Sequence, residues 1–562
     1  MLAGFNNFHP ITSRSLKIAK QRVLVAVSVF FLMFLAIIVR LADVMVFHRA
    51  DKNQDQNFAI PQIIERADIV DRNGAIIATS LPTVSLYACP HEILNIKEAV
   101  EKISSIFKEI DPKTLEEKIK SAKKFLWIKR NLSPTQEQAV LNQGLPGFHF
   151  LKTEKRVYPD QNLLSHVIGG TDIDNIGIAG LEKVFDDPLR ASETPIELSI
   201  DVKVQYAVHE ELQQAIEEFS AQGGAAIVMD IATGEIISMV SLPDFDPNKS
   251  SNPSDRNHFN MATSSAIEPG SSLKIINTAF ALEIGKISPF AQFDARKPLK
   301  IGRFAIHDYK PKATFLSVEE ILKYSSNIGS AQIVLSIGAD KQKQFFKKLG
   351  FLDTIKCELI ESQHPLFPRQ WTEASAMTIS FGHGIAFNPL QLTTVFCGLL
   401  NDGVLMLPTL LKRKVAYPGA RRIVSSKTSD LIKILLRINV IDGTNKLADV
   451  AGYCVGGKSG TAEKQQGGKY LKHSNYCGFI GAFPMTNPKY AVYVVLDDPK
   501  ATPKTYGYAT AGWNANPTAA KIIRRIGPML GIVAVDDKNI DWQEKLKRRY
   551  ETNEKTGAAA EL

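Results

Sequence analysis

The chain has 562 residues, of which 44% are hydrophobic, and a formal net charge of +9. This length predicts more than one folding unit, and the hydrophobic share is ordinary for a globular protein with a sizeable core. The excess of positive charge is spread over the whole chain. Basic clusters at 412–414 and 421–422 occur without any nucleic-acid-binding motif, so we expect solvated loops there and no nucleic-acid site.

The first predicted element is a membrane-spanning helix. Residues 23–39 form an apolar run without a charge, and residues 41–47 extend it past Arg40. The run approaches the length needed to cross a bilayer and exceeds a typical signal-peptide core. We expect a cytoplasmic tail at 1–21 and a signal anchor at 22–47, with a cleaved signal peptide as the alternative. The N-terminus is assigned to the cytoplasm because basic residues without acidic ones among them precede the run: Arg14, Lys17, Lys20 and Arg22.

Residues 48–198 mix short strand-like runs with amphipathic helices expected at 96–107 and 115–122. Each helix carries a serine with a lysine three residues later, Ser105 with Lys108 and Ser121 with Lys124. Both stretches are rich in lysine and glutamate. We therefore expect solvated helix faces there, without chemistry.

The tetrapeptide Ser271-Ser272-Leu273-Lys274 repeats this spacing in different surroundings. A turn at 268–270 precedes it and an apolar run follows, which predicts a buried helix with Ser271 in its first turn. The helix N-terminus stabilises negative charge beside Ser271, and Lys274 at i+3 lies on the same face. A serine acyl-transferase without a histidine base needs this pair, so we expect Ser271 to be the nucleophile.

The second motif is Ser325-Ser326-Asn327, between helix-like stretches at 318–324 and 328–337. Such a junction can project a hydroxyl and an amide into a cleft. The alternative is that Ser325 and Asn327 only cap helices. Another Ser-Ser-Asn at 250–252 lies in a proline-bounded loop, and we expect no role for it.

The third motif is Lys458-Ser459-Gly460-Thr461, preceded by two glycines and followed by strand-like runs at 476–483 and 490–496. Glycines on a strand let an extended peptide approach the backbone and add as a further strand. Lys458 then offers a positive charge for a carboxylate. A glycine-rich turn without chemistry is the alternative. A literal Lys-Thr-Gly at 555–557 lies in a charged tail with no strand near it.

Together, and in this order, the three motifs resemble those of class B penicillin-binding proteins, the monofunctional peptidoglycan D,D-transpeptidases. Residues 301–309 and the compact size resemble the septal, FtsI-like type, and the elongation-specific type is the nearest alternative. Leu273 stands where the family commonly has phenylalanine, which should alter packing more than chemistry. Further family landmarks follow the expected order along nearly the whole chain: residues 66–74, 177–182, 198–201 with Gln205, 380–385 and 389–392.

The resemblance implies an α/β (α+β) fold in several parts. An extended, mixed α/β pedestal for dimerisation or docking is expected at 48–198. A transpeptidase domain with an antiparallel sheet flanked by helices, as in serine β-lactamases, is expected at 199–540. Residues 541–562 alternate charged and small residues and should form a frayed helix or a disordered, flexible tail.

The resemblance also implies a role for each motif residue. Lys274, with a lowered pKa, takes the proton of Ser271, and the backbone amides of Ser271 and Thr461 form the oxyanion hole. Ser325 relays a proton to the leaving D-alanine, and Asn327 holds the acyl amide. The substrate's terminal carboxylate is bound by the third motif: Lys458, Ser459, Gly460 and Thr461.

Partners and alternatives follow from the same resemblance. We expect peptidoglycan stem peptides as substrates, β-lactams as inhibitors that acylate Ser271, and a membrane glycosyltransferase and division proteins as partners. The catalytic part would lie outside the cytoplasmic membrane. Alternatives are a D,D-carboxypeptidase or β-lactamase, which water delivery to the acyl-enzyme would distinguish, and a catalytically silent division scaffold.

Five cysteines are too few and too scattered for a disulfide framework. Cys454 and Cys477 flank the third motif and could form one bridge, although buried free thiols are favoured. No cluster of histidine, cysteine and aspartate has metal-ligand spacing. We therefore expect no metal and no cofactor.

Overall fold

The computed structural model describes residues 13–42, 66–249, 254–302, 304–413 and 419–558. Helix α1 (Ser13–Ala42) contains a stretch, Lys20–Val39, with a mean hydropathy of 2.8 and no buried residue. By length and composition this stretch can cross a membrane. The helix begins inside the predicted cytoplasmic tail, and the last residues of the predicted anchor, 43–47, lie outside the described residues.

The pedestal, residues 66–198, is built on a five-stranded sheet. Its long strand β2 pairs antiparallel with β4 along most of its length, from Thr79 opposite Val157 to Ala88 opposite Phe148. One end of β2 also pairs with β3 and the other with β1, which pairs in parallel with β7. The strands are β1 (Ile69–Val70), β2 (Ile76–Ala88), β3 (Leu126–Leu132), β4 (Phe148–Val157) and β7 (Ile196–Glu197).

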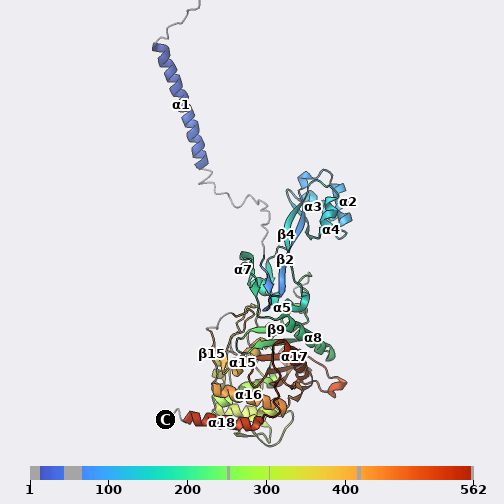
Figure 1. The fold of residues 1–562 in the computed structure, drawn as a ribbon, viewed down its shortest axis with the longest axis vertical. Coiled ribbons are helices and arrows are strands. Elements are labelled where there is room, and N and C mark those ends of the chain that lie inside the picture. Colours follow the sequence, from blue (N-terminus) through green and yellow to red (C-terminus); the bar gives the residue numbers. More distant parts are fainter. Residues whose placement is uncertain (1–12, 43–65, 250–253, 303, 414–418, 559–562) are drawn as a thin grey trace, which may run out of the picture.

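Helices cover the far end of this sheet, away from the rest of the molecule (Figure 1). They are α2 (Ile96–Ile106), α3 (Pro112–Ser121) and α4 (Pro134–Leu141), and they enclose a core of their own with Leu86, Ile103 and Phe107. The first two confirm the helices predicted near these positions. The lower pedestal contains α5 (Ser165–Ile168), α6 (Gly180–Val184) and α7 (Asp186–Ala191) with β5 (Gly170–Thr171) and β6 (Gly177–Ala179).

Two of the sequence landmarks meet inside the pedestal. The Arg66 Nε donates to Glu182 Oε2 at 2.6 Å, and the Arg156 Nε donates to Glu182 Oε1 at 2.7 Å. All three side chains are at most 1% exposed. Arg66 Nη1 also donates to Asp186 Oδ1 at 2.6 Å. Residues 66–74 and 177–182 therefore hold the pedestal together, as structural elements.

The C-terminal domain, residues 199–558, is centred on a five-stranded antiparallel sheet of order β16-β17-β18-β8-β9. Its strands alternate between two faces, as period-two burial requires. On β18, Val492 and Val494 face one core and Tyr493 and Val495 the other. The strands are β8 (Gly223–Asp230), β9 (Ile236–Leu242), β16 (Gly456–Gln466), β17 (Lys469–Phe483) and β18 (Tyr490–Asp497).

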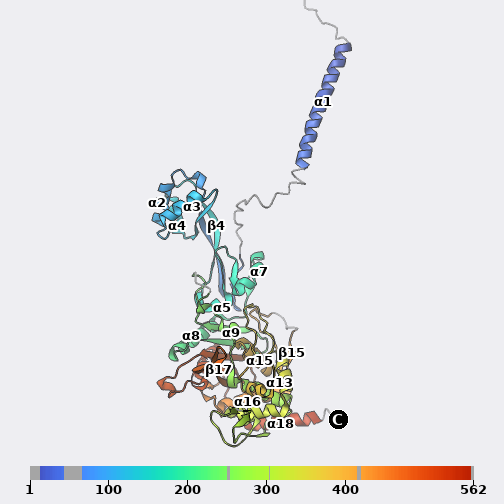
Figure 2. The same ribbon diagram turned by 180° about the vertical axis from the view of Figure 1, so that it is seen from behind.

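Helices cover both faces of this sheet, and Figure 2 shows α8 and α16 among them. One face packs on α8 (Val202–Glu218) and α17 (Ala515–Met529), the other on α10 (Lys274–Glu283), α15 (Pro389–Leu400) and α16 (Ser426–Ile441). The remaining helices are α9 (Met261–Ser264), α11 (Val318–Tyr324), α12 (Asn327–Ile337), α13 (Ala339–Leu349) and α14 (Glu373–Ile379). Short hairpins complete the domain: β10 (Gln292–Asp294) with β13 (Phe315–Ser317), β11 (Leu299–Ile301) with β12 (Phe304–Ile306), and β14 (Val404–Leu405) with β15 (Arg421–Arg422). The predicted α/β architecture is confirmed.

The charged C-terminal segment is a helix, one of the two predicted alternatives, and it is packed on the domain. Trp542–Ala558 forms helix α18, which lies beside α16 rather than free as a flexible tail. Trp542 is 3% exposed and Leu546 is fully buried. Arg549 pairs with Asp430 of α16, and Gln543 donates to Glu319 at 2.7 Å. The stretch is ordered because its few apolar residues face the core while its charges face outward or pair.

The pedestal and the C-terminal domain share one hydrophobic core. Ile69 and Ile77 of the pedestal belong to the same buried cluster as Ile227 and Phe396. At the junction, the Leu198 N–H donates to Val70 of the pedestal, and the next N–H, of Ser199, donates to Leu410 of the C-terminal domain. The two parts are therefore packed as one body at this end of the pedestal.

Candidate active site

Ser271 lies in a turn of 3₁₀-helix, η5 (Gly270–Leu273), that leads directly into α10. Gly270 adopts φ +53°, a left-handed conformation that favours glycine. Leu273 is fully buried and anchors the turn in the core, whereas Ser271 stays partly exposed. The predicted position of the serine at the start of a buried helix is confirmed, and the hydroxyl is both fixed and accessible.

Lys274 connects the first two motifs. Its Nζ donates to Ser271 Oγ at 2.8 Å and to Asn327 Oδ1 at 2.7 Å. It also lies 5.8 Å from the centre of the Phe381 ring. An amine this close to the hydroxyl can take its proton directly.

The Lys274 side chain is 1% exposed, and this burial lowers its pKa well below that of a free lysine. The neighbouring charge of Lys458 lowers the pKa further, whereas Asp308 opposes the shift. Burial penalises the charged ammonium because it loses water. The neutral amine, which is the form able to act as a base, is therefore accessible far below the pH at which an exposed lysine deprotonates.

The second motif forms the junction between α11 and α12. Ser325 ends α11 in a left-handed conformation, φ +60° and ψ +43°. The Ser326 hydroxyl caps α12 by accepting from the Gly329 N–H. Ser325 is therefore the C-cap of α11 and Ser326 the N-cap of α12, while Asn327 faces Lys274.

Asp308 holds this junction in place. One carboxylate oxygen accepts from the backbone N–H of Asn327 at 2.5 Å and of Ile328 at 3.0 Å, and the other accepts from Ser326 Oγ at 2.7 Å. The acid therefore caps the helix that carries Asn327, and its charge raises the pKa of the buried Lys274. Asp308 belongs to the landmark at 301–309, but no motif predicted its role in capping α12.

The third motif lies on β16, the edge strand of the sheet, beside the Ser271 turn. Gly460 packs against this turn so closely that a Cβ would lie 2.1 Å from the Pro269 carbonyl oxygen. A Cβ on Gly270 would in turn lie 2.6 Å from the Thr461 carbonyl oxygen. Gly460 thus makes room for the turn that carries Ser271, and the expected approach of a peptide to this strand stays a prediction. The backbones of Ser271 and Thr461, proposed for the oxyanion hole, are thereby held near each other.

Neighbouring residues fix this strand further. The Ser459 N–H donates to Asn445 Oδ1 at 2.9 Å, and the Thr461 hydroxyl accepts from the Ala511 N–H at 3.0 Å. Ser459 and Thr461 are half-buried, on the alternate positions from the buried Lys458 and Gly460. Their roles in binding a carboxylate stay predictions.

Lys458 is more deeply buried than the prediction of a fixed positive charge assumed. It is 1% exposed, its Nζ donates to the Ser459 carbonyl oxygen at 3.0 Å, and burial lowers its pKa to about 7. Near neutral pH both charge states are therefore populated. A carboxylate arriving beside it would favour the protonated form.

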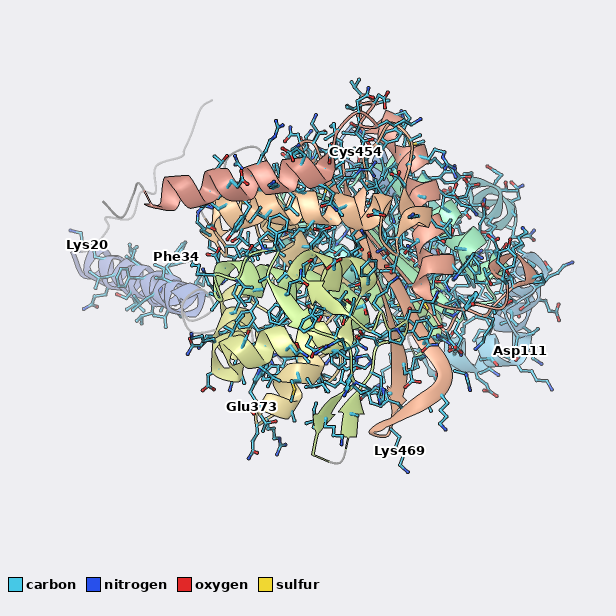
Figure 3. All side chains as sticks on the ribbon, turned by 90° about the horizontal axis from the view of Figure 1, so that it is seen from below. Lys20, Phe34, Asp111, Glu373, Cys454 and Lys469 are labelled. Carbon is cyan, nitrogen blue, oxygen red and sulfur yellow. The ribbon has the colours of Figure 1, made fainter. Side chains whose placement is uncertain are left out.

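Glu268 adds a contact that no motif indicated. Its Oε1 accepts from the Gly384 N–H at 2.9 Å, from Gln465 Nε2 at 2.7 Å and from the Tyr470 hydroxyl at 3.2 Å. Burial raises the pKa of this carboxyl group. Three residues before the nucleophile, Glu268 thus ties the projecting β16–β17 hairpin, whose tip carries Lys469 (Figure 3), to the 380–385 segment.

The other occurrences of the three motifs, where the structure describes them, do not contribute to this site. Ser105 on α2 and Ser121 on α3 are exposed and donate to carbonyl oxygens of their own helices, those of Lys102 and Lys118. Residues 555–557 lie in helix α18 rather than on a strand. Residues 250–252 lie outside the described residues. All five cysteines are free thiols, so Cys454 and Cys477 are not bridged.

Comparisons with known proteins agree with this geometry. The family model of the penicillin-binding protein transpeptidase domain matches residues 224–559, and the model of the penicillin-binding protein dimerisation domain matches residues 62–218. The chain belongs to the penicillin-binding protein transpeptidase family. In this penicillin-binding protein the matched transpeptidase region extends past the predicted end at 540 and includes α18.

Relatives match over most of the chain. It is 36% identical to the "probable peptidoglycan D,D-transpeptidase FtsI" of Caulobacter vibrioides, over 83% of this chain and 82% of the relative. It is 25% identical to the peptidoglycan D,D-transpeptidase FtsI of Escherichia coli K12, over 84% and 86%. The crystal structure of penicillin-binding protein 3 from Mycobacterium tuberculosis with aztreonam aligns with TM-score 0.67 at 23% identity, covering 84% of this chain and 98% of that one. At 23% identity, the likeness to the Mycobacterium tuberculosis structure shows the fold alone.

Proposed function

We propose that this penicillin-binding protein is an FtsI-type peptidoglycan D,D-transpeptidase that works through an acyl-enzyme on Ser271. The observation that carries the proposal is the 2.8 Å contact between Ser271 Oγ and the Nζ of a buried lysine whose pKa is strongly lowered. A nucleophile with an adjacent, neutral base is what serine acyl transfer needs. The relatives named as peptidoglycan D,D-transpeptidases support the choice of substrate.

In the first half-reaction Lys274 takes the proton of Ser271, and Oγ attacks the carbonyl carbon of the penultimate D-alanine of a stem peptide. The oxyanion accepts hydrogen bonds from the backbone amides of Ser271 and Thr461, each worth about 3 kcal/mol in the transition state. The C–N bond then breaks. Its nitrogen receives a proton through Ser325, and D-alanine leaves.

In the second half-reaction an amine from a neighbouring stem peptide attacks the ester carbon. It passes its proton back to the lysine–serine pair as the amide bond forms and Ser271 Oγ is released. Asn327, already bonded to Lys274, would hold the acyl amide, and Lys458 with Ser459 and Thr461 would hold the substrate's terminal carboxylate. β-Lactams would enter the same route and stop at the ester.

Location and partners extend the same proposal. The apolar stretch Lys20–Val39 would anchor the chain in the cytoplasmic membrane with its N-terminus inside and the pedestal and transpeptidase domain outside. We propose the pedestal as the docking region at 48–198 and the transpeptidase domain as beginning at 199. A membrane glycosyltransferase and division proteins would supply glycan strands and recruitment.

The test is intact-mass analysis of the full chain in detergent, incubated with benzylpenicillin and sampled over hours. We expect one stable adduct on the peptide that contains Ser271. Ser271→Ala should abolish the adduct, whereas Ser105→Ala, at an exposed serine with the same spacing to a lysine, should keep it. An adduct that disappears with penicillin turnover would indicate a hydrolase. A folded chain without any adduct would favour the silent scaffold.

The septal role has its own test in cells. A chromosomal Ser271→Ala variant should still be recruited to the division site while septal cross-linking falls, so that cells elongate without dividing. Loss of rod shape with normal division would instead assign the chain to elongation. Unchanged growth and cross-linking would contradict the enzymatic proposal.

A further inference from the structure

The head of the pedestal brings together a thiol, an imidazole and a carboxylate. Cys89, Glu92 and His149 each offer one ligand atom, and these atoms lie within 4.8 Å of one another. Among the residues that the structure describes, this is the one such group of histidine, cysteine and acidic side chains. Its members belong to the pedestal, so the Ser271 mechanism uses none of them.

The backbone around this group is tightly fixed. Cys89 follows β2 and precedes the 3₁₀ turn η2 (Pro90–Glu92); its N–H donates to the Gly147 carbonyl at 2.8 Å. A Cβ on Gly147 would lie 2.8 Å from Ile93 Cγ1, and its φ of +81° also favours glycine. The start of β4 therefore lies against η2, and His149 sits opposite Tyr87 on the paired strand.

The side chains are already aimed at one another. His149 Nε2 lies 2.5 Å from Glu92 Oε2, and the imidazole packs on Tyr87 with ring centres 5.4 Å apart. Both His149 and Glu92 side chains are 42% exposed, so an ion can reach the group from solvent. His91 Nε2, 3.5 Å from Glu92 Oε1, is available beside them as a further nitrogen.

The donor set selects the kind of ion. Calcium and magnesium prefer oxygen ligands alone, whereas zinc takes sulfur, nitrogen and oxygen together in a compact tetrahedral arrangement. We propose that Cys89, Glu92 and His149 bind one Zn²⁺ ion, with water or His91 in the fourth position. Glu92 and His149 are 57 positions apart in the sequence, so no motif indicates this group, and the proposal replaces our expectation of no metal.

A divalent ion would act on the thiol of this group. Zinc stabilises the thiolate and releases its proton when it binds. The bound ion would cross-link η2 to β4 and stiffen the head of the pedestal without contacting the transpeptidase site.

The test uses the full chain in detergent, without an affinity tag, stripped with a chelator and titrated with Zn²⁺ against a chromophoric competitor. We expect one Zn²⁺ per chain and at least a tenfold weaker affinity in Cys89→Ser and in His149→Ala. The matched control is Cys357→Ser, which removes another half-buried thiol far along the chain and should bind normally. Co²⁺ should give a thiolate charge-transfer absorption that only Cys89→Ser loses.

Folding is checked independently by the benzylpenicillin adduct on Ser271, which each variant should keep. If Cys89→Ser fails this check, the isosteric Glu92→Gln variant takes its place and should also weaken zinc at least tenfold. Absence of stoichiometric zinc in the wild-type chain would overturn the proposal. So would zinc binding of unchanged affinity in the Cys89→Ser/His149→Ala double variant.

Discussion

The core of the pedestal and the candidate active site of the transpeptidase domain surround buried positive charge differently. In the pedestal, Arg66 and Arg156 both lie against Glu182, and all three side chains are sealed from water. In the transpeptidase domain, Lys274 and Lys458 are equally buried, yet neither forms an ion pair with any carboxylate of the described residues.

The paired arginines stabilise the fold, whereas the unpaired lysines can change their protonation state. A buried guanidinium with a carboxylate at 2.6 Å keeps its proton and its position. A buried ammonium without such a partner loses much of its preference for the proton, and the pKa of Lys458 falls to about 7. Without a paired carboxylate, a buried lysine more readily becomes the neutral amine, which is the form that can act as a base, and changes to either region should test this difference.

The largest effect is expected from Lys274→Met, which removes the unpaired charge itself. The rate of benzylpenicillin acylation should fall by about 10²–10⁴-fold, the usual contribution of a positioned general base. The free energy of unfolding should not decrease, because an apolar side chain suits a buried site better than an ammonium. Lys108→Met, at an exposed lysine, is the control. A variant that is destabilised by several kcal/mol yet still acylates normally would break the comparison.

Glu182→Gln tests the paired charges of the pedestal by removing the anion between Arg66 and Arg156. Arg156 would lose its carboxylate partner and Arg66 would keep only Asp186, which should cost about 3–5 kcal/mol in a denaturant unfolding experiment. The surface pair of Arg130 with Asp174 offers a matched control, because Asp174→Asn should cost less than about 1 kcal/mol. Acylation of Ser271 by penicillin should be retained below the denaturation range. Equal stability of the two variants would contradict a structural role for Glu182.

Lys458→Met measures two contributions of the Lys458 charge, its bond to the ligand carboxylate and its effect on the pKa of Lys274. Losing a charge-assisted hydrogen bond to the ligand carboxylate costs about 1.5–3 kcal/mol, so acylation at neutral pH should fall roughly 10- to 100-fold. The charge of Lys458 lowers the pKa of Lys274, so its removal should raise that pKa. The ascending limb of the pH–rate profile, which follows deprotonation of Lys274, should therefore move to higher pH. Lys469→Met at the hairpin tip should leave the profile in place.

The smallest effect is expected from Glu268→Gln, which keeps the size of the side chain and removes its charge. The contacts to Gln465 and the Tyr470 hydroxyl should weaken by about 1 kcal/mol, which corresponds to a roughly fivefold change in acylation rate. Hydrogen exchange at residues 463–470 should become faster. Glu463→Gln, at an exposed glutamate on the same hairpin, should change neither quantity.

Local sequence signals predicted the parts of the site that depend on neighbours in the chain. The helix stretches 318–324 and 328–337 match α11 and α12 closely, because a buried apolar pattern and capping serines mark their ends. The buried helix after Ser271 followed from the apolar run alone. The side-chain roles at the third motif rest on the resemblance and stay predictions.

Contacts between distant segments could not be predicted in this way. Glu268 meets Tyr470 across 202 residues, and no periodicity or motif indicates that encounter. The burial of Lys458 depends on helices and strands that close around β16 only in the folded chain. The packing of helix α18 was not predicted, although Trp542, Leu546 and Tyr550 recur at four-residue intervals, a stripe that its surrounding charges obscure.

The packing of Gly460 under the Ser271 turn bears on how resistance to β-lactams could evolve in this protein. Any side chain at position 460 would collide with Pro269 and Ser272, so a substitution that disturbs the drug there also displaces the nucleophile. Substitutions that lower drug binding and keep the fold are therefore expected at positions other than 460. Lys469, which is exposed at the tip of the β16–β17 hairpin, can change without disturbing the contacts of Glu268 or the turn that carries Ser271.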